Sequence, residues 1–366
     1  MAADRRFIFD ADVHIHEDYR DLAPYFEMPW RRALEGDSPD RTGRNAGGER
    51  FLDAPGYSPL TPYDPILGDL PETEPHRVTS PEVLRADLDR RGATAGLIYT
   101  GRLSHAAVSN DHLYVAALGR AYNRYLAERW LNPSQGIYGT IMAANQVPEE
   151  AALEIETYAR VPGFAAVYLP NAGTYPLWGD ASYRPIFAAA EEADLPVVLH
   201  GAMTVYTVFP YQFHHVPTAL AKQTLSQSFA AQANLVSLLT TPVLAEFPRL
   251  RVVIDDAGIS WLPHVLGRLD HFYPYLRDEV PHLPGPPSEV ARRQFSVTTH
   301  PLDAAGGPKF LAALLETIGI ENVIYGSDWP HFDATTIDEV DAIPLSDTAK
   351  RDILGENARR IFRLGE

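Results

Sequence analysis

The sequence contains no cysteine, and only three of its 366 residues are lysine. The absence of cysteine excludes disulfide bonds, thiolate nucleophiles and sulfur ligands, so His, Asp and Glu are the only strong metal ligands that remain. No long uncharged apolar run occurs, which argues against a transmembrane span. The first residues lead into a strand pattern without the apolar region of a signal peptide, and a cytoplasmic location is therefore expected.

Positive charge is scarce as well, and the formal net charge is −17. Binding to a phosphate backbone depends on neutralisation by Lys and Arg, so this balance predicts no nucleic-acid partner. Hydrophobic residues make up 45% of the chain and charged residues 22%, which is enough apolar material for a large core. From the composition we expect a protein that binds neither nucleic acid nor membrane.

Short apolar runs alternate with longer helical patterns along the chain. The strand patterns cover residues 7–16, 94–100, 136–143, 163–170, 195–200, 250–256, 294–299 and 322–327. The helical patterns cover residues 81–91, 111–130, 148–160, 183–194, 220–246, 259–277, 308–319 and 347–364. Eight alternating units predict an α/β fold, a (β/α)8 TIM barrel formed by residues 1–366 as a single domain, with an open doubly wound sheet as the rival.

Residues 28–79 interrupt this alternation. The stretch is rich in Pro, Gly, Asp and Arg, has no clear periodicity and follows the first strand. Structureless loops of this length are uncommon in compact domains and are usually functional or disordered. The pattern predicts a long insertion between the first strand and the first helix, serving either as a lid over the barrel mouth or as an arm in a subunit contact.

Possible metal ligands stand at the ends of three predicted strands. His14 and His16 are two residues apart, so their side chains point to the same face of the first strand. His200 ends the fifth strand and Asp328 follows the eighth. Active-site groups of a TIM barrel lie at the C-terminal ends of its strands, and imidazole suits zinc and other late first-row ions. A satisfied core histidine at His200 and a helix N-cap at Asp328 are the structural alternatives.

Several motifs together resemble the amidohydrolase-related family (amidohydrolase 2) of the amidohydrolase superfamily, which also includes aminocarboxymuconate-semialdehyde decarboxylase-like enzymes. The motifs are DVHIH at 12–16, LPVVLH at 195–200, DAGISWLP at 256–263 followed by RLD at 268–270, YGSDWPH at 325–331 and ILGENARR at 353–360. The resemblance implies a TIM barrel with one catalytic divalent ion, usually Zn2+, among His14, His16, His200 and Asp328. Mn2+, Co2+ and Fe2+ remain open. Homodimers are also expected from the resemblance.

Two features refine the chemistry that the resemblance implies. Binuclear amidohydrolases often bridge their metals with a carboxylated lysine on strand four, and residues 164–170 contain no lysine, which favours a single ion. Decarboxylases of the family usually carry a histidine after strand six, whereas Asp256 stands there in this chain. Asp10 and Asp12 are candidates for hydrogen bonds to the ligating imidazoles, with a structural role at the barrel floor as the alternative.

The sequence therefore favours a metal-dependent hydrolase. We expect it to act on a small carbonyl-bearing acid, cyclic and aromatic acids included, or on an amide, lactone or activated C–C bond. A metal-bound water would attack, with Asp328 or Asp256 taking the proton. The alternatives are a metal-dependent non-oxidative decarboxylase and a catalytically inactive scaffold. Six further residues that follow predicted strands are candidate substrate contacts, and they are Arg102, Asn171, His214, His215, His300 and His331.

Overall fold

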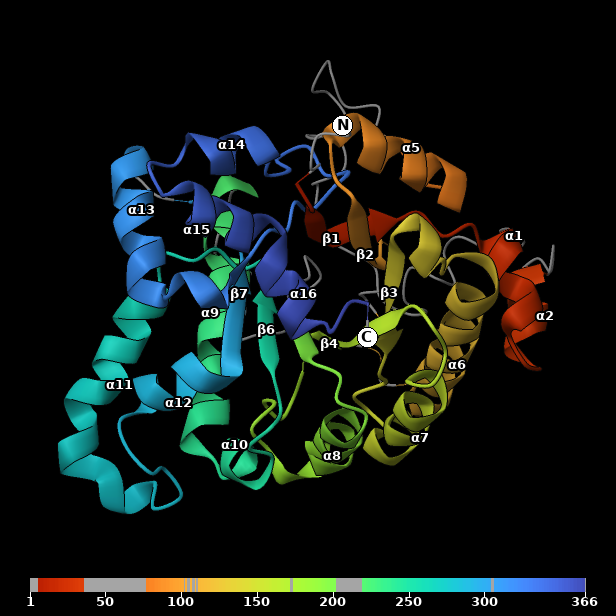
Figure 1. The fold of residues 1–366 in the computed structure, drawn as a ribbon. Helices are drawn as coiled ribbons and strands as arrows, with labels where there is room; N and C mark the ends of the chain where they lie inside the picture. Colours follow the sequence, from red (N-terminus) through yellow and green to blue (C-terminus); the bar gives the residue numbers. More distant parts are fainter. Residues whose placement is uncertain are drawn as a thin grey trace.

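Eight parallel strands form the centre of the molecule, in the order β1 to β8 (Figure 1). The computed structural model describes residues 6–35, 77–101, 103, 106, 109, 111–171, 174–201, 219–303 and 306–365. The strands are β1 (Phe9–Ile15), β2 (Ala95–Thr100), β3 (Ile137–Met142), β4 (Phe164–Pro170), β5 (Val197–His200), β6 (Val252–Asp255), β7 (Phe295–Thr298) and β8 (Val323–Ile324). Each strand pairs in parallel with the next, which confirms the predicted (β/α)8 barrel.

The barrel closes between β1 and the chain that follows β8. Ala11 N donates to Tyr325 O at 2.8 Å, and His14 N donates to Trp329 O at 2.7 Å. Val13 and Trp329 form an isolated parallel bridge, because β8 itself is only two residues long. The residues after β8 thus lie against the C-terminal half of β1, and this closure sets the relative position of the two strand ends.

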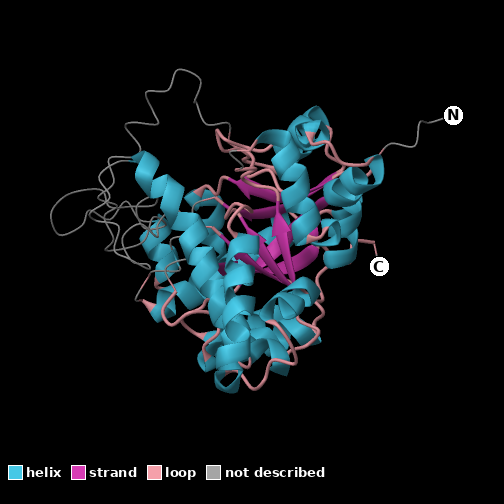
Figure 2. Ribbon diagram, turned by 90° about the vertical axis from the view of Figure 1, so that its left-hand side faces the viewer, coloured by secondary structure: helices cyan, strands magenta, loops and turns pink. Residues whose placement is uncertain are grey.

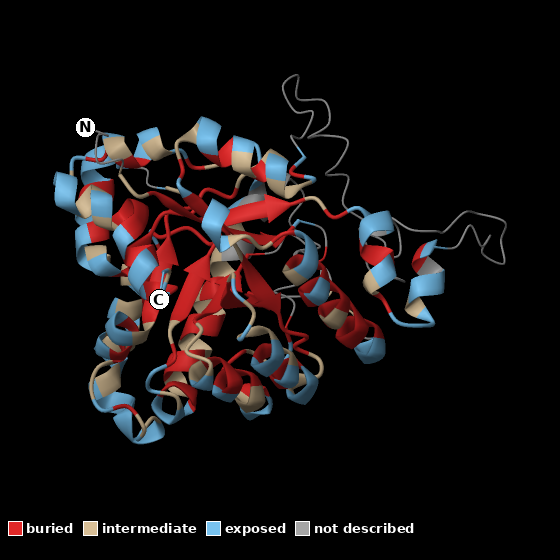
Figure 3. Cartoon of the chain, turned by 45° about the vertical axis from the view of Figure 1, so that its right-hand side comes forward, coloured by how far each residue is buried: buried red, intermediate tan, exposed pale blue. Residues whose placement is uncertain are grey.

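Helices surround the strands and turn their buried sides inward (Figures 2 and 3). After the first strand come two short helices, α1 (Tyr19–Leu22) and α2 (Trp30–Glu35). The others are α5 (Pro81–Arg91), α6 (His112–Arg129), α7 (Pro148–Tyr158), α8 (Arg184–Glu192), α9 (Ala219–Thr240), α10 (Val243–Glu246), α11 (Leu262–Leu276), α12 (Pro287–Gln294), α13 (Gly307–Ile318), α14 (Ile337–Ala342), α15 (Asp347–Arg351) and α16 (Asn357–Ile361). Within the described ranges, no helix combines the length and the apolar character that a membrane crossing needs.

Helix α5 shows why some boundaries are readable from sequence. Ser80 caps its N-terminus by accepting a hydrogen bond from Val83 N at 3.3 Å, and a proline occupies the first turn. Gly92 ends it with φ of 82°, the left-handed conformation that glycine adopts at little cost. The predicted range 81–91 is therefore confirmed.

The structure corrects three sequence-based predictions of secondary structure. The predicted helix 220–246 is two helices, α9 and α10, because Pro242 lies between them and acts as the N-cap of α10. Helices α12 and α14 were not predicted, since each spans less than three turns and gives a weak periodic signal. Residues 28–79 are not wholly irregular, because α2 lies within them, while residues 36–76 are outside the described part of the chain.

Candidate metal centre

Four buried side chains converge at the C-terminal end of the barrel. Asp12 and His14 extend from β1, His200 ends β5, and Asp328 follows β8. Their ligand atoms all lie within 4.8 Å of one another. Because all four side chains are shielded from solvent, their polar atoms need partners within the protein or a bound ion.

Both imidazoles are oriented by a backbone carbonyl. His14 Nδ1 lies 2.8 Å from Thr100 O at the end of β2, and His200 Nδ1 lies 2.6 Å from Gly201 O. A carbonyl can only accept, so each ring keeps a proton on Nδ1 and directs Nε2 toward the carboxylates. Metal-binding histidines are held in this way, because the fixed tautomer presents a lone pair to the ion.

The spacing of the ligand atoms fits a cation between them. His14 Nε2 lies 3.0 Å from Asp328 Oδ1 and 3.3 Å from Asp12 Oδ1, and His200 Nε2 lies 3.2 Å from Asp12 Oδ1. Two atoms bound to one ion at about 2.1 Å are separated by about 3.0 Å in octahedral geometry and about 3.4 Å in tetrahedral geometry. Among the residues that the structure describes, no hydrogen-bond partner is found for the buried atoms His14 Nε2 and Asp12 Oδ2. The residues therefore form a plausible site for a divalent metal.

A buried ion pair fixes the strand ends that carry two of these ligands. Asp10 is fully buried and pairs with Arg91 of α5. It also accepts hydrogen bonds from Ser327 N at 2.9 Å and Ser327 Oγ at 2.6 Å. The neighbouring Asp328 N donates to Asp12 O at 3.0 Å. This network connects β1 with the segment after β8 directly beneath the ligands.

Two aspartates of the rim adopt the left-handed backbone conformation. Asp256 has φ of 48° and Asp328 has φ of 63°. Such angles are uncommon for residues other than glycine and concentrate at functional sites. Asp256 also packs closely against Gly201, where a Cβ atom would lie only 2.3 Å from Asp256 Oδ2. Glycine after His200 is thus required for Asp256 to approach the end of β5.

A second group of ligand atoms shares Asp328 with the first. Asp256, His300 and Asp328 also have ligand atoms within 4.8 Å of one another, and His300 is buried at the end of β7. On the solvent side, His331 Nδ1 lies 2.7 Å from Asp328 Oδ1, and the ring of His331 is 4.8 Å from that of His14. The side chain of His331 is 49% exposed, so it can exchange protons with water.

The charges of the site shift its pKa values in opposite directions. Burial by itself lowers the pKa of His14, but the carboxylates of Asp12 and Asp328 raise it well above its usual range. Burial likewise raises the pKa of Asp328, yet His331 and His14 hold it well below the ordinary value. Burial, followed by the negative charges of Asp328 and Asp12, raises the pKa of Asp256 well above the ordinary value.

The structure brings together most, but not all, of the predicted site residues. His14, His200 and Asp328 meet as expected, and His300 and His331 both contact Asp328. His16 lies one residue beyond β1 and is not among the converging ligand atoms, so its role as a ligand stays a prediction. The predicted substrate contacts Arg102, His214 and His215 lie outside the described residues.

Asp12 was not predicted as a metal ligand from the sequence. It was expected to contact the imidazoles or the barrel floor, but its carboxylate lies among the ligand atoms. The signal was present, because Asp12 and His14 are two residues apart on one strand, as are His14 and His16. Asn171 is buried, and its backbone N–H donates to His200 O at 2.7 Å. Its side-chain oxygen accepts from Asn234 Nδ2 at 3.3 Å, and the backbone contact fixes the end of β4 against β5.

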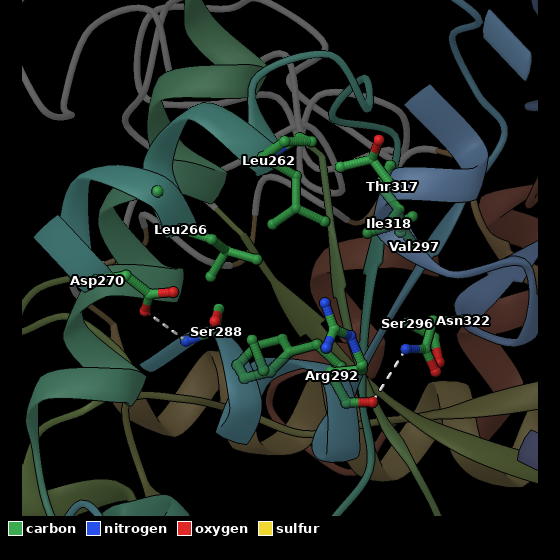
Figure 4. Close-up of a pocket in the computed structure, with 14 residues that line it drawn as sticks. Leu262, Leu266, Asp270, Ser288, Arg292, Ser296, Val297, Thr317, Ile318 and Asn322 are labelled. Atoms are coloured by element: carbon green, nitrogen blue, oxygen red, sulfur yellow. Dashed lines mark hydrogen bonds between the residues drawn. The ribbon is translucent and has the colours of Figure 1, made fainter. Parts of the chain in front are cut away.

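An open cavity of about 220 Å³ lies away from the metal centre, among α11, α12, α13 and β7 (Figure 4). Apolar side chains such as Leu262, Leu266 and Phe295 line it, together with Arg292. It contains none of the predicted site residues and none of the converging ligands. We therefore place the candidate functional site at the ligand cluster and not in this cavity.

A buried cluster of Asp and His ligand atoms at the C-terminal end of a (β/α)8 barrel is the arrangement expected of a metal-binding barrel protein. The amidohydrolase family model matches residues 11–364, and the chain belongs to this family. No curated protein is significantly similar in sequence.

Solved structures with the same fold cover nearly the whole chain. An amidohydrolase from Mycobacterium avium subsp. paratuberculosis K-10 is 19% identical, with 99% of this chain and 100% of that chain covered and a TM-score of 0.73. The 5-carboxyvanillate decarboxylase of Sphingomonas paucimobilis is 20% identical, with coverage of 98% and 99% and a TM-score of 0.68. A dihydroxybenzoic acid decarboxylase from Polaromonas sp. JS666, with bound manganese, is 16% identical, with coverage of 99% and 98% and a TM-score of 0.66.

Proposed function

We propose that the protein is a metal-dependent, non-oxidative decarboxylase of a small aromatic carboxylic acid. The observation that carries the proposal is the buried cluster of Asp12, His14, His200 and Asp328 at the barrel rim. Decarboxylation is preferred over the hydrolysis that the sequence favoured, because similar structures include decarboxylases of 5-carboxyvanillate and dihydroxybenzoate. Mn2+ is a candidate ion beside Zn2+, since three similar decarboxylase structures contain manganese.

The residues around the cluster provide the roles that this reaction needs. A bound divalent ion would supply the positive charge that holds and polarises a substrate carboxylate. Asp12, His14, His200 and Asp328 would hold that ion, and their burial keeps water from competing for it. Cleavage of the bond to the carboxylate leaves an electron pair on the ring carbon, so the carbon must receive a proton as carbon dioxide leaves.

His331 is the best-placed group to deliver this proton. Its imidazole lies at the mouth of the site, beside His14 and in contact with Asp328 Oδ1. Imidazole is the side chain that most often serves as a general acid, and water can reach the half-exposed ring. The site therefore has an imidazole at its rim even though Asp256 occupies the position of the histidine expected after strand six.

The test is product analysis with a panel of benzoates that carry a hydroxyl group next to the carboxylate. In D2O, decarboxylation puts one deuteron on the vacated carbon and releases carbon dioxide. In water labelled with 18O, hydrolysis would instead put the label into the organic product. Incorporation of 18O into a cleaved product, without release of carbon dioxide, would overturn the proposal in favour of the hydrolase.

Substitution of His331 tests the proton donor separately from the metal site. Loss of a general acid typically lowers the rate by 10²–10⁴-fold, and we expect His331→Gln to lower kcat by about 10²-fold or more. Its metal content should stay at the wild-type level, because Asp12, His14, His200 and Asp328 are untouched. The exposed His271 of α11 provides the matched control, and His271→Gln should retain wild-type kcat.

A further inference from the structure

The carboxylate of Asp328 faces two different sets of ligand atoms. Its Oδ1 atom lies 3.0 Å from His14 Nε2, within the metal centre described above. Its Oδ2 atom lies 3.4 Å from His300 Nε2, on the side of β7. Asp256 completes the second set, with Oδ1 3.7 Å from His300 Nε2. One carboxylate therefore joins two adjacent groups of potential ligands.

His300 is also contacted at Nδ1, by a hydroxyl group where the histidines of the first site meet a carbonyl oxygen. Its ring is 98% buried, and Nδ1 lies 3.2 Å from Thr335 Oγ1, whose hydroxyl can accept the Nδ1 proton. The lone pair of Nε2 then faces Asp328 and Asp256. The contact of 3.4 Å with Asp328 is close, yet the only hydrogen bond found for the His300 ring within the described residues is the one to Thr335. This arrangement suits a ligand of an ion better than a donor to a carboxylate.

The crowding of carboxyl groups favours a second cation. Asp12, Asp256 and Asp328 all lie within the combined site, and a cation between Asp256 and Asp328 would offset the repulsion between them. Burial strengthens this effect, because charges attract and repel more strongly away from water.

From this geometry we propose a second, weaker divalent-cation site formed by Asp256, His300 and Asp328, with Asp328 bridging the two ions. The inference rests on the proposed metal centre, because Asp328 belongs to both sets of ligands. Carboxylate-bridged ions in two-metal sites lie about 3.5–4 Å apart and hold both ends of a reacting group. The second ion would bind the far oxygen of the substrate carboxylate and help to neutralise it.

The absence of a lysine on β4 does not conflict with this site. That absence removes the carboxylated-lysine bridge from strand four, and it leaves open a bridge from the end of β8. The second set is also looser than the first, since one of its separations reaches 3.7 Å and the residues described there supply only three ligands. We therefore expect the second ion to bind at least about 10-fold more weakly than the first, which corresponds to about 1.4 kcal/mol.

Mn2+ titration of the metal-free full-length protein tests the proposal. Bound Mn2+ per chain is measured by elemental analysis at increasing free Mn2+, and the electron paramagnetic resonance spectrum is recorded at each step. The wild type should give a signal of isolated Mn2+ near one ion per chain and a spin-coupled signal near two. His300→Ala should stop at one ion and show no coupled signal, while His271→Ala should behave as the wild type does.

Asp256→Asn provides a second, independent variant, and circular dichroism confirms that each variant is folded. It should also bind one ion without spin coupling. One ion in the wild type at saturating Mn2+, or two ions in both site variants, would overturn the second site and leave the decarboxylase proposal standing. Absence of bound Mn2+ and Zn2+ from the wild type would instead overturn the metal centre itself, and with it both proposals.

Discussion

The Arg91–Asp10 pair allows a quantitative test of how the strand ends are held. Asp10 is fully buried, and the side chain of Arg91 is only 14% exposed. Removing one partner of a buried pair leaves an uncompensated charge and typically costs about 3–5 kcal/mol. Asp10 would keep its hydrogen bonds from Ser327 N and Oγ, so we expect Arg91→Met to lower the free energy of unfolding by about 3 kcal/mol, the lower end of that range.

The penalty should depend on pH in a defined direction. Burial raises the pKa of Asp10, whereas Arg91 lowers it, so the Arg91→Met substitution raises the folded-state pKa further. An acid with a raised folded-state pKa loses stability as pH rises from its unfolded-state pKa, about 3.9, through the folded-state value. The loss caused by Arg91→Met should therefore be larger at pH 8 than at pH 5.

Urea unfolding at the two pH values measures both effects. Adding Asp10→Asn to Arg91→Met should recover at least about 1 kcal/mol, because no unpaired charge is then buried. Arg31 pairs with Glu35 on the surface of α2, and Arg31→Met should cost no more than about 0.5 kcal/mol as the control. A loss below about 1 kcal/mol for Arg91→Met, or one that is equal at pH 5 and pH 8, would refute the assignment of the pair as a buried charge clamp.

Two further predictions concern the metal centre. In the metal-free protein, obtained by chelation, thermal stability should fall as pH rises above neutrality. Burial lowers the pKa of His14, but the adjacent carboxylates raise it above the unfolded-state value, so the stability that the protonated imidazole contributes is lost as it deprotonates. Thermal unfolding of the metal-loaded protein should lack this pH dependence. Gly201→Ala should destabilise the protein by about 1–3 kcal/mol, since the new Cβ would lie 2.4 Å from Asp256 O. In Gly267→Ala, where nothing lies within 4 Å of the new atom, urea unfolding should show no loss of stability.

The barrel was predictable because each strand and helix carries its own local signal. Parallel strands buried on both faces read as continuous apolar runs, and all eight predicted strands overlap the observed ones. Strand ends were less predictable, as β8 shows by spanning two residues where six were expected. The length of β8 depends on how many of its residues pair with β7 on one side and with β1 on the other. The positions of those two strands are set by the closed barrel and not by the local sequence.

Short helices escaped prediction for a related reason. Helix α14 has a capping box formed by Thr336 and Glu339, but six residues are too few to show a period. Helix α10 is separated from α9 by Pro242, whereas the apolar pattern of 220–246 continues through this proline and predicts a single helix. In both cases, packing against the rest of the barrel stabilises a helix that local sequence only weakly favours.

The sequence by itself determined the fold, the family motifs and the strand ends that carry the ligands. It did not show that Asp12 joins His14 at the site, because alternate residues of a strand share a face and Asp12, His14 and His16 all satisfy that rule. The tertiary structure showed this, because the segment after β8 brings Asp328 to the level of His14, with the carboxylate of Asp12 close to both. The same closure placed His300 beside Asp328, a contact between chain segments 28 residues apart that no local pattern encodes.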